Sequence, residues 1–241
     1  MFPKISIVTI CFNAEETIEL TIQSVVQQSY ENIEYIIIDG NSSDNTMEIV
    51  NRYEDRIDIV SSERDDGIYN AMNKGLFKAS GDFVLFLNAD DQLLAPTTIE
   101  NAAKHIALTP DSHIIYGSIF EFNSDTSEGS IWKEKLPSAH RLYRTTIPHP
   151  SSFFRREPML KLKGYDERYR IGGDHEYYIR ALFAKHTFKR IPTLITKFSK
   201  HGASNSEASI ETMRLERNRA IDENYPLWLK FLCAFFEAVR I

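Results

Sequence analysis

Residues 81–91 read GDFVLFLNADD, in which an apolar run from Phe83 to Leu87 ends at Asn88, Asp90 and Asp91. A short run that is wholly apolar predicts a β-strand covered on both faces. Such a strand belongs to a sheet that has other elements packed above and below it. This stretch therefore indicates an α/β arrangement, and it places three polar side chains directly after the strand.

Similar apolar runs precede this one, and segments with helical spacing separate them. The predicted strands are Ile5–Ile10, Tyr35–Ile38 and Ile57–Val60, and the predicted helices are Ala14–Gln28, a helix capped by Asp44, and Gly67–Ala79. Alternation of strands and helices implies right-handed crossovers and a mostly parallel sheet. We therefore expect an α/β, Rossmann-like fold with helices flanking the sheet.

Each predicted strand ends in polar residues. They are Thr9 and Asn13 after the first, Asp39 after the second, Glu63, Asp65 and Asp66 after the third, and Asn88, Asp90 and Asp91 after the fourth. A single Asp in such a place is commonly a helix cap or a turn residue. Ligands of parallel sheets bind outside the carboxyl ends of the strands, so four polar ends together predict a site.

The composition of the 241 residues excludes several classes of protein. The chain is 42% hydrophobic and 26% charged, with a mean hydropathy of −0.33, unlike disordered or polytopic membrane proteins. Its net charge of −6 argues against a nucleic-acid partner. Cys11 and Cys233 match no metal or redox spacing, and the first ten residues form no secretory signal. We therefore expect a cytoplasmic location.

Nucleotide-binding loops of the common kinds are absent from the sequence. It contains neither a GxxxxGK[ST] loop nor a GxGxxG turn after the first predicted strand. A crevice lined by carboxylates would repel a bare diphosphate. A bridging divalent cation removes that conflict, because Mg²⁺ and Mn²⁺ prefer carboxylate and phosphate oxygens.

The chain resembles the family-2 glycosyltransferases, which are inverting enzymes of the GT-A fold with nucleotide-sugar donors. The similar segments are SIVTICFN (6–13), IIDGNSSDNT (37–46), ERDDGIYNAMNKG (63–75), GDFVLFLNADD (81–91) and GYDERYRIGGDHEYYIR (164–180). GIYNAMNKG resembles the bacterial branch that builds surface polysaccharides and lipid-linked oligosaccharides. The resemblance implies a GT-A domain at 1–204, with a nucleotide-binding half (1–91) and an acceptor half (92–204), and a C-terminal helical extension at 205–241.

The resemblance also implies roles for individual residues. The residues expected to bind the nucleotide sugar are Thr9, Asn13, Asp39, Asp65, Lys74, Asn88 and His149. Asp90 and Asp91 would bind Mn²⁺ or Mg²⁺, and Asp174 would be the general base that takes the proton of the acceptor hydroxyl. Asn88 departs from the family pattern, which usually has Asp there, and Asn70 also replaces a frequent Asp.

The surroundings of these residues suggest further expectations. Asp174 would begin a helix, Asp174–Lys185, after Gly172 and Gly173, which would let a sugar approach closely. The alternative role for Asp174 is that of a helix N-cap. His149 lies between Pro148 and Pro150, which predicts an extended segment. Remaining polar residues that we considered for the diphosphate, the base or a phosphorylated acceptor are His201, His175, Glu176, Arg155 and Arg156.

The end of the chain carries two predicted helices. Residues 208–224 are highly charged, whereas residues 227–241 hold Trp228, Phe231, Leu232, Phe235 and Phe236. A helix over 227–241 is too short to span a bilayer and has a wide apolar face. Packing against the body, peripheral contact with the inner face of the membrane and homodimerisation are the three interpretations left open.

These features together predict a metal-dependent inverting glycosyltransferase. We expect it to move a sugar, with UDP-hexose as the first expectation for the donor, to a saccharide or lipid-linked saccharide acceptor. One alternative is a nucleotidyltransferase, although CFNAEET after the first strand lacks the glycine-rich basic loop of that class. The other is an inactive sugar-nucleotide-binding scaffold, which Asn88 suggests.

Overall fold

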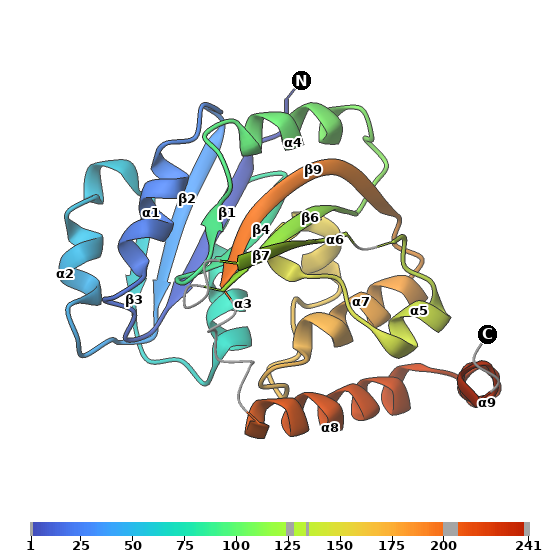
Figure 1. Ribbon diagram of the computed structural model, residues 1–241. Coiled ribbons are helices and arrows are strands. Elements are labelled where there is room, and N and C mark those ends of the chain that lie inside the picture. The colour runs from blue at the N-terminus through green and yellow to red at the C-terminus, as the bar shows by residue number, and fades with distance from the viewer. Residues whose placement is uncertain (1, 124–127, 134, 200–206, 239–241) are drawn as a thin grey trace.

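The computed structural model describes residues 2–123, 128–133, 135–199 and 207–238. Four strands form its parallel part, in the spatial order β3-β2-β1-β4 (Figure 1). They are β1 (Ile5–Cys11), β2 (Ile33–Asp39), β3 (Ile59–Ser62) and β4 (Phe83–Asn88). β1 is buried along its whole length, as the apolar and β-branched sequence predicts for a central strand.

Helices cover both faces of this parallel part. They are α1 (Ile18–Val26), α2 (Thr46–Asn51), the 3₁₀ helix η1 (Glu54–Arg56), α3 (Ile68–Lys78) and α4 (Thr98–Ala107). Because side chains alternate along a strand, Ile5 and Ile7 of β1 pack in one cluster with α1, α2 and α4. Val8 and Ile10 point to the opposite face and pack against α3.

Antiparallel pairs begin beyond β4. β8 (Ser152–Arg155) pairs antiparallel with β4 and with β6 (Ile114–Asn123), and β9 (Phe188–Ser199) runs parallel to β6. Two short strands complete the sheet among the described residues, β5 (Gln92–Leu93) on β9 and β7 (Glu128–Trp132) on β6. The α/β class with helices flanking a central sheet is thus confirmed, with parallel pairing concentrated in the first half.

The second half carries the remaining helices. They are α5 (Ala139–Arg144), the 3₁₀ helix η2 (His149–Ser151), α6 (Arg156–Lys161), α7 (Gly173–Phe183), α8 (Glu207–Asn224) and α9 (Leu227–Ala238). α8 runs along one side of the molecule beneath α7, and α9 lies at its end (Figure 1). Ala220, Ile221, Tyr225 and Cys233 are buried in the same core as α7. The two C-terminal helices therefore contribute to the core on this face of the sheet.

The helix predicted over Ala14–Gln28 begins later than expected, at Ile18. The loop before it is held by side chains that follow β2, because Ala14 N donates to Thr46 Oγ1 at 2.7 Å and Glu15 N donates to Asp44 Oδ2 at 3.1 Å. These contacts between loops are not visible in the local pattern. No helix among the described residues is long and apolar enough to cross a membrane.

A buried carboxylate ties the amino ends of β1, β2 and β4 together. Glu34 of β2 accepts hydrogen bonds from Ser6 Oγ at 2.6 Å, from Ser80 N at 2.7 Å and from Lys4 Nζ at 2.9 Å. Burial by itself would raise the pKa of Glu34, but the hydrogen bonds from Ser6, Ser80 and Lys4 lower it to about 2. The charged form of Glu34 is therefore the form that stabilises the fold.

We predict that Glu34→Gln lowers the free energy of unfolding at pH 7 by about 1–3 kcal/mol, because it weakens charge-assisted hydrogen bonds in a buried place. A depressed pKa stabilises the folded state above the ordinary value of 4.5, and this contribution is lost as the pH falls toward 2. Urea titrations at pH 7 and at pH 3 should show the difference between variant and wild type shrinking at the lower pH. Glu31→Gln, at an exposed position, is the control; equal losses in both variants would contradict the prediction.

Candidate active site

The loops after β1 and β2 are joined by hydrogen bonds at the carboxyl edge of the sheet. Asn13 adopts a left-handed backbone conformation with φ of 46°. Its backbone N donates to Ser42 Oγ at 2.8 Å, and its side-chain Oδ1 accepts from Ser43 N at 2.9 Å. Asn tolerates this conformation better than most residues do. Asn13 therefore lies at the predicted edge, with its side chain engaged in the neighbouring loop.

Asp39 is fully buried at the end of β2. Its carboxylate accepts hydrogen bonds from Ser62 Oγ at 2.6 Å and from Ser42 Oγ at 2.5 Å. The thiol of Cys11 lies 3.7 Å from Asp39 Oδ1. The protein's own donors thus occupy this carboxylate, which holds together the ends of three neighbouring strands.

Phe12 and Asp65 flank the backbone of Gly40. A Cβ added at Gly40 would lie 2.6 Å from Asp65 Oδ2 and 3.3 Å from the ring of Phe12. Phe12 is 63% exposed, although its neighbours in β1 are buried, and Asp65 Oδ1 accepts from Gly67 N at 3.0 Å. Asp65 and Phe12 therefore cover the buried backbone of Gly40, with the exposed ring of Phe12 beside the carboxylate. Sequence reasoning missed Phe12; its signal is an aromatic residue directly after a buried strand.

Two residues expected to bind the nucleotide differ in their surroundings. Thr9 is fully buried within β1, and its hydroxyl lies 3.2 Å from the hydroxyl of Tyr35. Because β1 continues to Cys11, Thr9 lies in the core and not at the end of the strand, and its contact with the nucleotide stays a prediction. Lys74 of α3 lies at the edge, where Nζ donates to Arg64 O at 2.8 Å and is 3.4 Å from Glu63 Oε1.

The loop after β4 contains oxygen atoms that have no partner. Asn88 Oδ1 and Asp91 Oδ2 are both buried without a hydrogen bond in the described part of the chain. Asp91 Oδ1 accepts from Ser199 N at 3.3 Å. Burial raises the pKa of Asp90, and burial together with the charge of Asp90 raises the pKa of Asp91. Such carboxylates are suited to a cation.

The oxygen atoms of Asn88, Asp90 and Asp91 are the candidate ligands for Mn²⁺ or Mg²⁺. The described residues contain no ready group of three or more His, Cys, Asp or Glu side chains around one point. Mg²⁺ usually binds through one or two carboxylates together with substrate phosphates and water. Asp90 and Asp91, with the free oxygen of Asn88, fit that mode of binding, in which the nucleotide supplies the remaining ligands.

His149 links the loop after β4 to the start of α7. Its Nδ1 lies 3.6 Å from Asp174 Oδ2, and both side chains are about 85% buried, with exposures of 15% and 14%. Its charge also interacts with Asp90, whose pKa it lowers against the effect of burial. Because β8 runs antiparallel to β4, the residues that precede β8 lie where β4 ends. His149 Nε2 is buried and has no partner among the described residues.

The backbone at His149 differs from the expectation of an extended segment. His149 begins the 3₁₀ helix η2, with Pro150 as its second residue. Pro is tolerated there because the first N–H groups of a helix have no intrahelical partner. The flanking prolines therefore did not exclude a helical turn.

Asp174 lies in the first turn of α7, and Gly172 is the N-cap residue. Asp174 Oδ1 accepts from His175 N at 2.7 Å, which leaves Oδ2 toward His149. The preceding glycine was expected to let a sugar approach. Instead, a Cβ at Gly173 would lie 2.7 Å from the ring of Tyr69, so the close neighbour of Gly173 is the protein itself.

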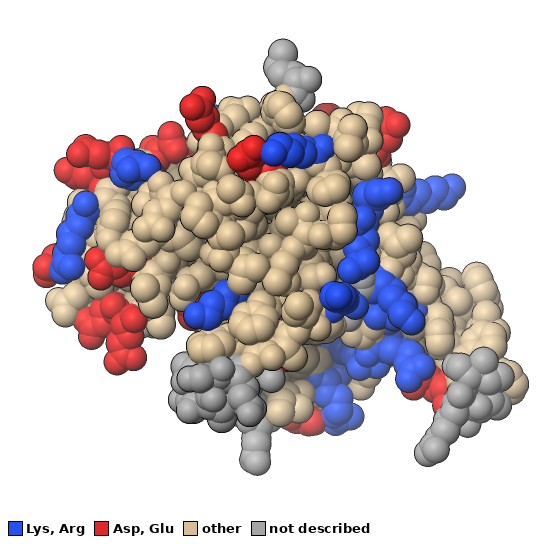
Figure 2. Space-filling model, turned by 45° about the horizontal axis from the view of Figure 1, so that its top comes forward, with Lys and Arg blue, Asp and Glu red and all other residues tan. Residues whose placement is uncertain are grey.

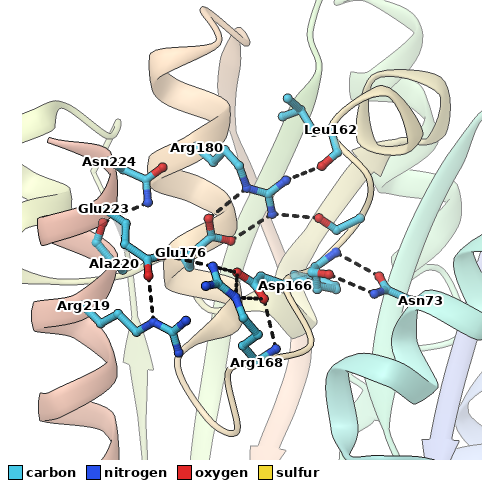
Figure 3. Close-up of polar contacts among 12 residues, drawn as sticks. Asn73, Leu162, Asp166, Arg168, Glu176, Arg180, Arg219, Ala220, Glu223 and Asn224 are labelled. Atoms are coloured by element: carbon cyan, nitrogen blue, oxygen red, sulfur yellow. Dashed lines mark hydrogen bonds and ion pairs between the residues drawn. The ribbon is translucent and has the colours of Figure 1, made fainter.

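The residues that follow Asp174 have structural contacts. His175 is buried and its Nε2 lies 2.6 Å from Leu142 O, and burial lowers its pKa. Glu176 is 5% exposed at its side chain and pairs with Arg180 at 2.9 Å. Figure 3 shows Arg180 between Glu176 and the backbone near Leu162. These residues hold α7 in place rather than lining the site.

GIYNAMNKG is explained by packing between α3 and the loop at 164–167. Asn73 is buried, and its amide pairs with both backbone groups of Tyr165, at 2.9 Å each (Figure 3). Asn70 Nδ2 donates to Glu167 Oε2 at 2.8 Å. A Cβ at Gly75 would lie 2.3 Å from the side chain of Val8. The motif therefore joins α3 to the segment that leads to α7.

Three further polar residues were expected candidates for contacts with the substrates. Arg155 lies over the ring of Phe83, 4.6 Å from its centroid, and donates to Ser112 O at 3.0 Å. It therefore holds the sheet and does not project toward an acceptor. Arg156 has a buried Nε without a partner among the described residues. His201 lies outside the described residues.

Comparison with known sequences gives a consistent family. Residues 6–169 match the family described as Glycosyl transferase family 2. A PGL/p-HBAD biosynthesis glycosyltransferase of Mycobacterium tuberculosis is 28% identical over 199 residues, which cover 81% of this chain and 73% of the relative. An uncharacterized glycosyltransferase of the same species is 32% identical over 184 residues, 74% of this chain and 69% of the relative.

Comparison with solved structures gives the same fold. TarS 1–349 of Staphylococcus aureus in complex with UDP-GlcNAc has a TM-score of 0.71 at 19% identity, over 92% of this chain and 68% of that one. The mannosyltransferase PcManGT of Pyrobaculum calidifontis, in complex with GDP-Man and Mn²⁺, has a TM-score of 0.66 at 16% identity. That match covers 99% of this chain and 81% of the other.

Proposed function

The chain belongs to glycosyl transferase family 2 and has the GT-A fold, and we propose that it moves a sugar from a nucleotide-diphosphate sugar to an acceptor hydroxyl with inversion. The observation that carries this proposal is the convergence of Asp90, His149 and Asp174 from three separate segments. The loop after β4, which carries Asp90, thus lies near the first turn of α7, which carries Asp174. Transfer between two bound substrates requires such groups to lie close together.

The proposed donor site lies at Phe12 and Asp65, which cover the backbone of Gly40. The ring of Phe12 is exposed, so a flat base can stack on it, and the carboxylate of Asp65 can recognise the edge of the base. Asn13, Asp39 and Lys74 hold the surrounding loops. UDP-hexose is our first choice of donor, and the UDP-GlcNAc complex of TarS supports it, while the GDP-Man complex of PcManGT makes GDP-sugars the next test.

We propose that Asp90 and Asp91 hold Mn²⁺ or Mg²⁺ together with the diphosphate, while Asn88 orients the ribose or a bound water. When bound, the cation neutralises the charge that develops on the leaving nucleoside diphosphate. The Mn²⁺ in PcManGT supports this assignment. Asn88 brings no charge, which is the observation that keeps an inactive binding scaffold as the second candidate.

Asp174 is the proposed general base. Inversion needs one displacement, in which the acceptor oxygen loses its proton as it attacks the anomeric carbon from the face opposite the leaving group. Asp174 Oδ2 is turned toward His149, which helps to hold the carboxylate in one orientation. The acceptor is proposed to be a saccharide or a lipid-linked saccharide of polysaccharide biosynthesis, bound by the half at 92–204; the relative named for PGL/p-HBAD biosynthesis supports a biosynthetic role.

Asp174→Asn is predicted to lower the rate of transfer by about 10²–10⁴-fold, because a positioned base contributes that much to proton removal. Donor affinity should change little, since Asp174 is the proposed base and is not among the residues proposed to bind the nucleotide. Transfer from a panel of UDP-, GDP- and dTDP-sugars with Mn²⁺ measures the rate, and calorimetry with the active donor measures affinity. Asp222→Asn, at an exposed position on α8, is the matched control. Full activity of Asp174→Asn would refute the assignment of the base, and no turnover by wild type with any donor would favour the scaffold.

Asp90→Ala is predicted to weaken binding of UDP in the presence of Mn²⁺. Loss of an outer-shell partner of a metal costs about 10–100-fold in affinity, so loss of a direct ligand should cost at least about tenfold. Thermal shift and calorimetry with UDP, with Mn²⁺ or with EDTA, make the comparison. The two proteins should differ with Mn²⁺ and become alike in EDTA. Equal affinity for UDP in Mn²⁺ would rule out a metal-binding role for Asp90.

We also propose that α9 rests on an anionic membrane surface. Trp228, Phe231 and Phe235 are 67%, 76% and 60% exposed along α9. The basic helix α5 adjoins α9, because His140 of α5 contacts the ring of Phe236, with 5.6 Å between ring centroids. Lys and Arg side chains gather on the side of the molecule toward the edge that carries α9 (Figure 2). Aromatic residues beside basic ones suit the interface of anionic lipids.

Replacing both Trp228 and Phe231 by Ser is predicted to weaken binding to vesicles of phosphatidylcholine and phosphatidylserine by about tenfold or more, since a buried aromatic side chain contributes about 1.5–3 kcal/mol. Co-sedimentation measures binding, and vesicles of phosphatidylcholine alone should bind wild type more weakly. Phe77→Ser, on the exposed side of α3, is the control. A wild-type protein that ignores anionic vesicles, or a variant that changes only from dimer to monomer in size-exclusion chromatography, would contradict the membrane proposal.

A further inference from the structure

A carboxylate from α8 binds the loop that leads into α7. Glu216 Oε1 accepts a hydrogen bond from Arg170 N at 2.6 Å, and Glu216 Oε2 accepts from Ile171 N at 2.9 Å and from Gly172 N at 2.7 Å. Three consecutive backbone N–H groups thus point at one side chain. Charged acceptors form strong hydrogen bonds with backbone N–H groups, so Glu216 holds one side of the loop at 170–172.

The opposite side of the same loop is held by α3. The hydroxyl of Tyr69 donates to Ile171 O, and its ring packs against Gly173, where an added Cβ would lie 2.7 Å away. Tyr69 is 4% exposed and belongs to GIYNAMNKG. The backbone of the loop at 170–172 is therefore clamped between α3 and α8, with its N–H groups on Glu216 and one carbonyl on Tyr69.

α8 is itself firmly placed. Arg217, next to Glu216, donates from Nη2 to Tyr143 O at 2.8 Å. One turn along the helix, Ala220 is fully buried in the same core as α7, and Ile221 is 7% exposed. The carboxylate of Glu216 is thus carried by a helix that is packed into the core.

We infer that Glu216 is a positioning residue that acts through Asp174. This inference rests on the proposed function, because it gives Glu216 a role only if Asp174 accepts the acceptor's proton. Asp174 follows the clamped loop by two residues and lies in the first turn of the helix that Gly172 caps. The position of the Asp174 carboxylate relative to His149 and to a bound acceptor therefore depends on the contact with α8.

The chemistry of the contact explains why Gln cannot replace Glu216. A carboxylate has two oxygens that both accept, and here they serve three donors. A carboxamide keeps one accepting oxygen and turns its NH₂ group toward backbone N–H groups, which leaves at least one of the three donors without its hydrogen bond to residue 216. Glu216→Gln is almost unchanged in size, so the loop loses its hydrogen bonds without a cavity being formed.

We expect Glu216→Gln to lower kcat for transfer by about 10–100-fold, since small displacements of reacting groups cost that much. The KM for the donor should stay unchanged, because the hydrogen bonds of Glu216 go to the loop at 170–172 and not to the residues proposed to bind the nucleotide. In the Asp174→Asn background the same substitution should alter the residual rate by less than about twofold, because two residues that act through one step are not additive. Glu211→Gln, which removes an exposed pair with Arg214 on the same helix, is the control and should leave kcat as in wild type.

Hydrogen–deuterium exchange of the amides at 170–172 supplies a readout that does not depend on turnover. Their protection should fall in Glu216→Gln and stay in Glu211→Gln, with both proteins folded by circular dichroism. Unchanged exchange, an unchanged kcat, or an equal further loss in the Asp174→Asn background would each overturn the positioning role while the proposed function stands. Absence of transfer by wild type, with the exchange pattern as expected, would overturn the proposed function and with it the link to Asp174.

Discussion

The register of the parallel strands is the constraint on which the rest of the structure depends. In the pairing of β1 with β2 and β4, Cys11 lies opposite Asp39 and Ile10 lies opposite Asn88, while Asp39 lies opposite Ser62 of β3. A shift of one residue would turn every side chain of a strand to the other face of the sheet, where it would have to pack against a different set of helices. The strand ends are therefore level, and the loops that leave them meet at one edge of the sheet.

The second half of the chain is attached to the parallel strands by antiparallel pairing of β8 with β4. Because β8 starts beside the end of β4, the turn at His149 lies near Asp90. The first turn of α7 places Asp174 beside His149. Three elements that are far apart in sequence thus meet without a long loop. α8 then completes the arrangement from outside, since Glu216 holds the loop before Asp174 on backbone N–H groups.

Many polar residues in the stretches that resemble the family make contacts that stabilise the fold. The sequence alone does not separate them from residues that face a ligand. The carboxylate of Asp39 accepts hydrogen bonds from Ser42 and Ser62, and Asn73 pairs with the backbone of Tyr165. By contrast, Asn88 and Asp91 each keep a buried oxygen that no described residue satisfies. Whether a polar side chain hydrogen-bonds to the rest of the protein depends on donors from other segments. Local patterns therefore predict that the side chain lies at the edge of the sheet but not which groups it contacts.

The sequence by itself determined the alternation of strands and helices, the edge of the sheet at which Asn13, Asp65, Asp90 and their neighbours collect, and the likeness to the family to which the chain belongs. These follow from periodicity and from strand ends, which are local properties. Only the tertiary structure decided that Thr9 is in the core, that Phe12 is exposed beside Gly40, and that Gly173 makes room for Tyr69. It alone brought His149 to Asp174 and Glu216 to the loop before it. The physical reason is that these contacts join residues tens of positions apart, and only the packing of the sheet and helices sets the distances between them.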